Sequence, residues 1–364
     1  MNIVFDNIIY SLQRSGGGSV YWTELIKRFN SSKENIEFYD HENDKDNFFR
    51  QELKLRNTSK ETKFPFGIRR YLPFTEEITE KSIFHSSYYR YSNSKNAINV
   101  TTVHDFTTEY YRTGLARWVH FQQKKQAIKK SEGIVCISEN TKKDLLKFHP
   151  WAANKKIKVI NNGVSDDFFK IENEFNLESI DERFKKFTDK KLLIFIGHRT
   201  SYKNFDKAVE AYSNLNHPDY HFLIIGEALN ESEHNLLNEK LKQDSYTVLS
   251  GINNFKLNHL YNKAFCLIYP SSYEGFGIPL IEAMKTGLPV IASKNSSIPE
   301  VAGEAGVLLD NLDENSINQE IIKLEDSTYR SMIIEKGWVQ AKKFNWDKTF
   351  EQYHQFYKEL YDGK

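Results

Sequence analysis

Short apolar runs alternate along the chain with longer segments whose apolar residues recur at helical spacing. Runs of the first kind are typical of strands that are buried on both faces of a sheet. We predict such strands at 3–9, 82–86, 97–103, 133–137, 156–160, 192–197, 221–226, 246–251, 264–269, 288–293 and 306–309.

The segments with helical spacing lie between these runs. We predict helices at 20–29, 115–130, 142–148, 205–215, 257–263, from 279 onward, and at 317–344 and 346–361. Alternation of strands and helices indicates an α/β fold with parallel sheets. The alternation occurs in two halves of a 364-residue chain, which fits two facing Rossmann-like domains with ligands at the strand ends.

Two stretches do not follow this pattern. Residues 31–62 are polar, and we assign no element to them. Residues 166–190 are rich in charge and are expected to form a connector.

Composition narrows the class of protein. Hydrophobic residues make up 39% and charged residues 27%, as in soluble globular proteins, and the net charge of +1 gives no overall field that would attract nucleic acid. Cys136 and Cys266 lie in apolar runs and are expected to be buried thiols. We find no signal peptide and no apolar run of roughly 18 residues, so we expect a cytosolic protein that meets a membrane at most on its surface.

The stretch from Tyr269 to Ser293 predicts a site. A strand leads into a loop with Gly275 and Gly277, and Pro279 is typical of a first helical turn. Glycines allow the backbone to approach a ligand closely. The amides of Gly277, Ile278 and Leu280, together with the positive end of the helix dipole, are expected to bind a phosphate.

Two carboxylates accompany this phosphate site. Glu274 precedes the turn, and Glu282 lies within the helix. Because carboxylates would compete with phosphate for the same amides, we expect them to face hydroxyl groups on either side of it. A ligand that has a diphosphate with hydroxyl groups on either side of it is a nucleotide sugar. The alternative is that the two acids compensate the helix dipole.

The segment Glu-Gly-Phe-Gly-Ile-Pro-Leu-Ile-Glu, from Glu274 to Glu282, resembles the donor-site motif of retaining glycosyltransferases of family 4. This resemblance implies the GT-B fold, with two facing Rossmann-like domains, a central cleft and a C-terminal helix that crosses back. It implies an acceptor domain at 1–165, joined by 347–364, and a donor domain at 166–346. The backbone of Gly275, Phe276, Gly277 and Ile278 would then contact the sugar, with Glu274 on its hydroxyls and Glu282 on the ribose.

Two cations follow the strand at 192–197. Arg199 and Lys203 can neutralise a diphosphate, and the family has an arginine and a lysine at a similar spacing. Many members have the arginine directly after a glycine, whereas His198 intervenes here. The alternative is that both are ordinary surface cations.

Further positions carry roles by resemblance. His104 ends a strand in Val-His-Asp, where the family has a histidine that hydrogen-bonds the donor sugar; the alternative is a histidine satisfied in the core. Asp105 is expected to be a structural neighbour of His104 or to cap the following turn. Gly251 and Ile252 match the nucleobase turn, and Gly16, Gly17 and Gly18 match a loop near the acceptor, or form a plain turn. Ser296 and Ser297 are expected to cap a helix.

The wider pattern is similar to bacterial transferases that build O-antigen and other surface polysaccharides. It implies retaining transfer of a hexose or deoxyhexose, with mannose-type sugars favoured, from a nucleotide-diphosphate sugar to a glycan that is expected to be polyprenyl-diphosphate-linked. No Asp-x-Asp motif stands in a suitable place, so no metal and no cofactor are expected. Alternatives are a non-catalytic nucleotide-sugar-binding module, a hydrolase, or a transferase with a soluble or protein acceptor.

Basic aromatic stretches at 63–74 and 115–130 suggest an anionic membrane surface as a further partner. Such contact would place the protein on the inner face of the plasma membrane. The alternatives are a loop packed on its own domain and a solvated basic helix face.

Overall fold

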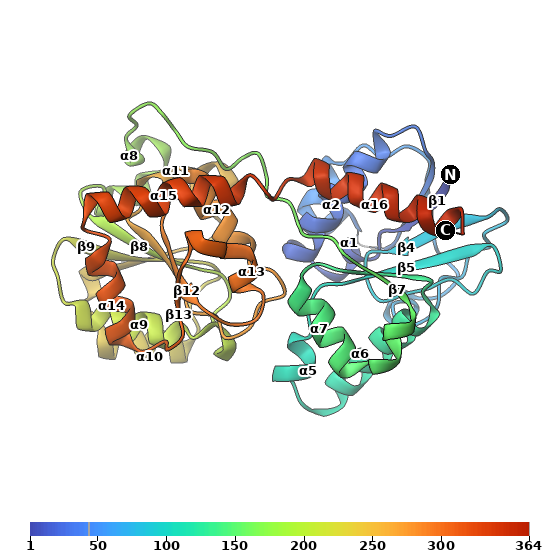
Figure 1. Ribbon diagram of the computed structural model, residues 1–364, viewed down its shortest axis with the longest axis horizontal. Helices are drawn as coiled ribbons and strands as arrows, with labels where there is room; N and C mark the ends of the chain where they lie inside the picture. Colours follow the sequence, from blue (N-terminus) through green and yellow to red (C-terminus); the bar gives the residue numbers. More distant parts are fainter. Residues whose placement is uncertain (43, 364) are drawn as a thin grey trace. The chain divides into compact units, whose positions relative to one another are not determined.

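The computed structural model describes residues 1–42 and 44–363 and divides them into two compact units. Unit 1 comprises Met1–Gly163 and Asn345–Lys364, and unit 2 comprises Val164–Phe344. Figure 1 shows that each unit contains its own sheet with helices around it. The chain leaves unit 1 after Gly163 and returns to it at Asn345.

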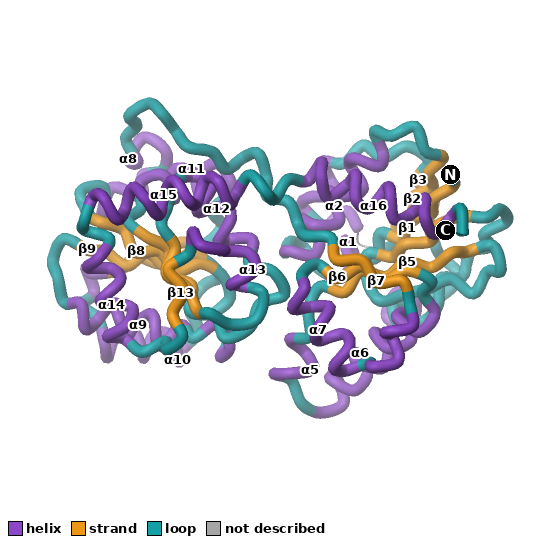
Figure 2. The backbone as a smooth tube through the Cα atoms, viewed as in Figure 1, coloured by secondary structure: helices purple, strands orange, loops and turns teal. Residues whose placement is uncertain are grey.

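Unit 1 contains a seven-stranded parallel sheet in the order β3-β2-β1-β4-β5-β6-β7. Its strands, drawn in orange in Figure 2, are β1 (Asn2–Asp6), β2 (Asn35–Asp40), β3 (Thr58–Lys60), β4 (Ser82–Ser86), β5 (Ala97–Val103), β6 (Gly133–Cys136) and β7 (Lys156–Val159). Its helices are α1 (Ile9–Leu12), α2 (Gly17–Asn30), α3 (Phe48–Glu52), α4 (Phe66–Arg69), α5 (Thr107–Tyr111), α6 (Gly114–Lys130), α7 (Glu139–Phe148) and α16 (Trp346–Tyr361). The strand order reverses between β1 and β4, and such a switch point is where open α/β sheets bind ligands.

Unit 2 contains a six-stranded parallel sheet in the order β10-β9-β8-β11-β12-β13. Its strands are β8 (Lys191–Ile196), β9 (Tyr220–Ile225), β10 (Tyr246–Leu249), β11 (Cys266–Tyr269), β12 (Val290–Ser293) and β13 (Val307–Leu309). Its helices are α8 (Leu177–Ile180), α9 (Phe205–Leu215), α10 (Glu231–Lys240), α11 (Asn254–Lys263), α12 (Ile278–Thr286), α13 (Ile298–Ala302), α14 (Glu314–Lys323) and α15 (Ser327–Ala341). Here the switch point lies between β8 and β11.

Two Rossmann-like units confirm the predicted fold class, including the returning helix. Helix α16 lies in unit 1, where Tyr357 stacks on Phe29 at 5.2 Å between ring centroids. The Tyr353 hydroxyl bonds to the hydroxyls of Tyr21 and Thr102. This helix therefore buries its aromatic face in the core of the first half of the chain.

The unassigned stretch 31–62 contains two strands of this sheet. In β2, Ile36, Phe38 and Asp40 are buried, while Asn35 and Glu37 are exposed. The alternation is real but spans only one short strand near the edge of the sheet, and polar residues surround it. Burial within the sheet, rather than a long apolar run, makes this segment a strand.

The single helix predicted at 317–344 is wrong. Helix α14 ends at Lys323, and α15 begins after Asp326, whose side chain accepts a hydrogen bond from the Tyr329 amide. This N-cap satisfies a helix-start amide and divides the segment into two helices.

The start of unit 1 also differs from the prediction. Strand β1 ends at Asp6 rather than at residue 9, because Ile9 already begins α1. Gly17 and Gly18 lie in the first turn of α2, so of the three glycines Gly16 alone precedes the helix. The connector at 166–190 contains α8 and a 3-10 turn at Glu182–Phe187.

Candidate functional site

The carboxyl ends of β8 and β11 are neighbours in the sheet of unit 2, because the two strands pair in parallel. The connection 197–204 follows β8, and the loop 270–277 follows β11. Parallel sheets bind ligands at this edge, and at the switch point above all. The predicted donor residues fall on these two segments and on the helix α12 that follows the second one, except for Gly251 and Ile252, which follow β10.

Lys203 and Glu274 come together at this edge. Their side chains form an ion pair, with 2.5 Å between the Lys203 Nζ and the Glu274 Oε1. The two side chains are 13% and 12% exposed, and the Tyr269 hydroxyl lies 3.5 Å from the same Nζ. Each charge therefore satisfies the other, and a ligand with both phosphates and hydroxyls would have to give each a new partner.

Helix α12 begins beside this pair. Gly277 is its N-cap, with φ of +104°, a backbone conformation that favours glycine. Pro279 lies in the first turn, as predicted. The Leu280 amide donates to the Gly277 carbonyl at 3.1 Å, so the expectation that it serves a phosphate is wrong. The amides of Gly277 and Ile278 open the helix at the positive end of its dipole.

Gly275 and Phe276 are both predicted to contact the sugar through their backbone. Gly275 does not have a positive φ, so its backbone could be adopted by other residues. The Phe276 side chain is buried and packs on Phe344, with 5.5 Å between ring centroids. A ligand at this loop can therefore meet the backbone of Phe276 but not its ring.

Glu282 lies on α12, and its side chain is half-buried. Burial raises the pKa of its carboxyl to about 8, although the neighbouring Tyr261 hydroxyl acts to lower it. At pH 7 the folded protein keeps this carboxyl protonated, whereas the unfolded chain would ionise it, and this difference lowers the stability of the folded state. Such perturbed groups are concentrated at functional sites.

The structure does not bring Arg199 to the Lys203–Glu274 pair. Its guanidinium donates to the carbonyls of Glu227 and Ala228, both at 2.9 Å, and pairs with Glu233 at 2.9 Å. The side chain is 3% exposed. These partners hold it beneath the connection after β9. The neighbouring His198 side chain, in contrast, is exposed.

The two positions predicted for a nucleobase follow β10, at the edge of the sheet. Gly251 is exposed and has φ of +67°, and Ile252 is half-buried. The turn therefore requires the glycine at this point.

In unit 1, His104 directly follows β5 and is half-buried. The Tyr21 ring packs edge-on against its imidazole, with 4.6 Å between ring centroids. Burial lowers the pKa of His104 to about 4, with Asp105 raising it and Lys124 lowering it. The imidazole is therefore neutral at pH 7, with one nitrogen able to donate and the other able to accept a hydrogen bond. Asp105 accepts from the Thr107 amide, at the first residue of α5, at 2.8 Å, although the N-cap of this helix is Phe106.

The glycines after β1 lie against Gln13. A side chain at Gly16 would clash with the Gln13 Oε1, and one at Gly18 would meet its Nε2 at 2.9 Å. At Gly16 the φ of +155° favours glycine, whereas at Gly18 the flexible end of the Gln13 side chain could move aside for a Cβ. Gly17 opens α2 with open space around its Cα.

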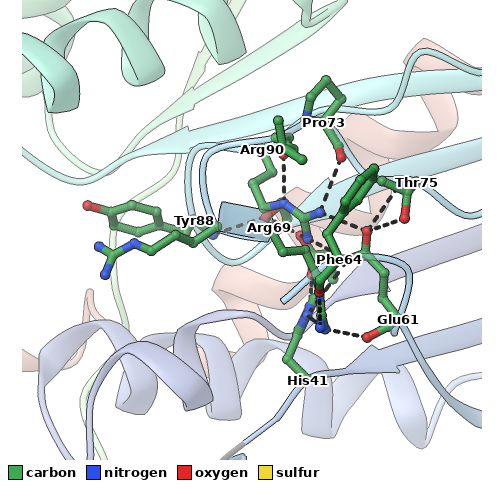
Figure 3. A network of polar contacts seen from close by, with 12 residues as sticks. His41, Glu61, Phe64, Arg69, Pro73, Thr75, Tyr88 and Arg90 are labelled. Carbon is green, nitrogen blue, oxygen red and sulfur yellow. Dashed lines mark hydrogen bonds and ion pairs between the residues drawn. The ribbon is translucent and has the colours of Figure 1, made fainter. Parts of the chain in front are cut away.

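A buried ion network that no sequence pattern predicted lies at the switch point of unit 1. His41 follows β2, and its Nε2 lies 2.5 Å from Asp6 at the end of β1. The Arg90 Nη1 lies 2.9 Å from both Asp6 and Glu61. Arg69 bonds to the carbonyls of Glu61 and Phe64, as Figure 3 shows.

These charges balance one another away from water. Burial raises the pKa of Asp6, but Arg90 and His41 outweigh it and hold that pKa at about 2. Glu61 also accepts from the amide and hydroxyl of Thr75, at 3.0 and 2.7 Å. Asp6, His41 and Glu61 offer ligand atoms within 4.8 Å of one another, but two guanidinium groups already pair with them. The network thus fixes segment 61–75 onto β1, β2 and β4.

Buried ion pairs account for one cation in each of the two basic aromatic stretches. Arg69 of the first stretch is fully buried, as the alternative of a loop packed on its own domain implies. Lys124, assigned to a basic helix face, is also buried, and it pairs with Glu109 at 2.8 Å and donates to the Asp105 carbonyl at 2.8 Å. Both cations hold their own domain together.

Two family models match the chain, one in each half. The model described as Glycosyltransferase Family 4 matches residues 15–168, and the model described as Glycosyl transferases group 1 matches residues 177–338. Among curated relatives, the chain is similar to O-antigen chain mannosyltransferase B of Escherichia coli, with 42% identity over 105 residues, which are 29% of this chain and 28% of the relative. It is also similar to O-antigen chain mannosyltransferase RfbU of Salmonella typhimurium, with 28% identity over 231 residues, which are 62% of this chain and 60% of the relative. The matches thus span less than two thirds of these relatives' own length.

Solved structures share the fold over the whole chain. Sucrose-phosphate synthase from Thermosynechococcus elongatus has a TM-score of 0.76 at 16% identity, with all of both chains covered. Anabaena Alr3699/HepE in complex with UDP-glucose has a TM-score of 0.74 at 13% identity, with 98% of this chain and 99% of that chain covered. At these identities the likeness establishes the two-domain architecture.

Proposed function

Because the chain belongs to the family 4 glycosyltransferases with the GT-B fold, we propose that it transfers a mannose-type hexose or deoxyhexose from a nucleotide-diphosphate sugar to a glycan of a bacterial surface polysaccharide. The observation that carries this proposal is the Lys203–Glu274 pair beside the start of α12. It combines a cation for phosphate with a carboxylate for sugar hydroxyls. The names of the relatives, both O-antigen mannosyltransferases, support the sugar and the acceptor class.

Unit 2 holds the donor in this proposal. The diphosphate takes the Lys203 Nζ and the amides of Gly277 and Ile278, the sugar hydroxyls take Glu274, and the ribose takes Glu282. In unit 1, Gly16, Gly17 and Gly18 at the start of α2 belong to the acceptor side, and the neutral His104 keeps the role toward the donor sugar that the resemblance implies. Binding exchanges the internal ion pair for two contacts with the ligand, so little net charge is buried unpaired.

Catalysis then depends on charge that develops on the leaving diphosphate. The Lys203 ammonium and the helix-start amides already point to this edge, and preorganised groups of this kind account for most of the rate enhancement in many enzymes. We propose that the leaving phosphate accepts the proton of the attacking hydroxyl, that the anomeric configuration is retained, and that no divalent ion is required. Arg199 has no part in this step, since its guanidinium is bound to Glu233 and two carbonyls.

A panel of nucleotide sugars tests the proposal. GDP-mannose, UDP-glucose and their relatives are screened by thermal shift, and the best donor is then assayed for nucleoside diphosphate release with and without a lipid-linked glycan. Release that requires the acceptor supports a transferase, release without it indicates a hydrolase, and binding without release indicates a binding module. NMR of the product's anomeric proton and addition of EDTA test retention and metal independence.

We further propose that unit 1 binds to an anionic membrane surface and meets its lipid-linked acceptor there. Among the described residues, no helix has both the length and the hydropathy to cross a bilayer. Exposed apolar side chains are concentrated on two segments, 64–71 and 110–118, here called the apolar patch. Its large members, between 38% and 76% exposed, are Phe64, Ile68, Tyr71, Tyr110, Tyr111, Leu115 and Trp118.

The two segments of the apolar patch lie close together. The Gln123 side chain of α6 donates to the Arg70 carbonyl at 2.7 Å. Burial raises the pKa of the Tyr88 hydroxyl, and Arg70 of the first segment and Arg112 of the second both lower the pKa of this same hydroxyl by a smaller amount. Residues 62–72 and 110–119 include no Asp or Glu, whereas Lys63, Arg70, Arg112 and Arg117 are at least partly exposed. These segments therefore combine exposed apolar side chains with cations and contain no acid. Such a surface suits anionic headgroups, whose attraction for each nearby cation contributes about 1 kcal/mol to binding.

Vesicle flotation tests this surface. Ile68→Ser and Trp118→Ser should each reduce binding to phosphatidylglycerol vesicles several-fold, and phosphatidylcholine vesicles should bind weakly throughout. Phe255→Ser is the matched control, because Phe255 is 59% exposed in unit 2. Equal loss with the control variant, or equal binding to neutral vesicles, would contradict the assignment.

A further inference from the structure

Two residues other than glycine adopt left-handed backbone next to the loop 270–277. Asn204 has φ of +49° and Ser296 has φ of +51°. A left-handed conformation is unfavourable for residues with a side chain, least so for Asn, and persists when the surrounding structure imposes it. Both residues follow strands that flank β11 in the sheet, β8 for Asn204 and β12 for Ser296.

Ser296 and Ser297 hold the backbone of Glu274. The Ser296 Oγ accepts from the Glu274 amide at 2.8 Å and lies 3.2 Å from the Glu274 carbonyl. The Ser297 Oγ lies 2.9 Å from that carbonyl and 3.0 Å from the carbonyl of Phe276. The sequence predicts that these serines cap α13, but Ser297 makes no side-chain cap bond there. Their hydroxyls serve the loop instead of the helix.

Asn204 holds the same loop from the next residue after Lys203. Its side-chain amide donates to the Pro270 carbonyl and to the Ser272 hydroxyl, both at 2.7 Å. The Ser272 amide donates to the Tyr202 carbonyl at 2.7 Å. The segment that carries Lys203 and the loop that carries Glu274 are thus tied together on both sides of the ion pair.

We infer that Asn204, Ser296 and Ser297 are positioning residues that set the Glu274 carboxylate against the Lys203 ammonium, and so prepare the site for the sugar of the donor. This inference rests on the proposed function for its catalytic consequence. The structural basis of the inference does not depend on the proposed function. Strained backbone at two positions is maintained by side-chain hydrogen bonds that converge on the loop 270–277. Precise placement matters, because a displacement of about 1 Å in a reacting group can cost roughly 100-fold in rate.

The test separates the hydroxyl of Ser296 from its backbone. Ser296→Gly accepts the left-handed conformation but lacks the hydroxyl, Ser296→Ala lacks the hydroxyl and keeps the strain, and Ser296→Asn tolerates the conformation and keeps a hydrogen-bonding group. Asn204→Gly makes the corresponding change on the other side. Asn216→Gly is the control, because Asn216 is exposed, has φ of +39° and ends α9 away from the loop.

Two measurements are made on each full-length variant. Hydrogen exchange of the peptide that contains 270–277 should accelerate by about 10-fold or more in Ser296→Gly and Asn204→Gly, and should not change in Asn216→Gly. With the best donor, kcat/KM should fall by about 10-fold or more in the first two variants, and Ser296→Asn should recover part of it. Affinity for the bare nucleoside diphosphate should stay within about twofold, since the sugar contact is the one displaced.

The outcomes are distinct for each part. Unchanged exchange in Ser296→Gly and Asn204→Gly, or faster exchange with unchanged kcat/KM, overturns the inference. A parallel loss of diphosphate affinity and melting temperature also overturns it, because it indicates a general structural role. If the wild-type protein turns over no nucleotide sugar, the proposed function fails, while the exchange measurement still decides whether these side chains order the loop.

Discussion

Replacing Glu282 with Gln should stabilise unit 2 and weaken donor binding at the same time. The carboxyl has a pKa of about 8 in the folded protein because of burial, against an ordinary value of 4.5. At pH 7 the folded state therefore keeps a proton that the unfolded chain has released. Each pH unit between 4.5 and 7 is equivalent to about 1.4 kcal/mol, so keeping the proton costs roughly 3 kcal/mol before solvent screening.

Glutamine is neutral at every pH and does not bear this cost. Because the Glu282 side chain is half-buried, we discount the cost by half and expect Glu282→Gln to gain about 1.5 kcal/mol at pH 7. For a domain of this size, that corresponds to about 3–6 °C in the melting temperature. The contribution of the raised pKa to the stability of the wild type is fully present below pH 4.5 and is lost as the pH rises to 8. The stability that Glu282→Gln gains over the wild type should therefore be near zero at pH 4.5 and largest above pH 8.

Thermal melts of wild type and variant between pH 4.5 and 9 measure this difference. Glu335→Gln, an exposed position on α15, serves as the control and should show no pH-dependent gain. Donor affinity is measured in parallel by calorimetry. It should fall by roughly 10-fold in Glu282→Gln, because we expect the two ribose hydroxyls to bind the ionised carboxylate, and an amide offers only one acceptor oxygen. A gain that does not vary with pH, or a loss of stability at pH 7, would refute the reasoning.

Three further predictions address the remaining charged groups. Glu274→Ala should abolish transfer and leave nucleoside diphosphate binding within a few-fold by calorimetry; wild-type turnover would contradict its role. Lys203→Ala should weaken diphosphate binding by roughly 2 kcal/mol, whereas Arg199→Ala should change it little and lower the melting temperature instead, because its partners lie within its own unit. The reverse order of these two variants would show that Arg199 moves to the ligand. Arg90→Ala should destabilise unit 1 by about 3–5 kcal/mol in urea melts, because it leaves the buried carboxylates of Glu61 and Asp6 without their cation. A loss of stability below about 1 kcal/mol would argue against a tightly balanced network.

The sequence alone determined the architecture, because buried parallel strands leave short apolar runs and each is followed by an amphipathic helix. β4, β5, α9 and α16 begin and end where the pattern predicts them. It also determined the Glu274–Glu282 segment, since Pro279 and the glycines mark a helix start that is local in the chain. Where an element depended on its neighbours, as β2 does within its sheet, the local pattern was too short to predict it.

The tertiary structure alone decided which charges are available. Arg199 and Lys203 are four residues apart and look equivalent in the sequence, yet one is bound to Glu233 and the other to Glu274. The segment of Arg69 was expected to lie at lipid headgroups or to pack as a loop on its own domain, and Arg69 is buried in an ion network whose members come from distant parts of the chain. Ionic partners are chosen by where strands end in space, and a side chain's partners, rather than its residue type, decide whether it is free to meet a ligand.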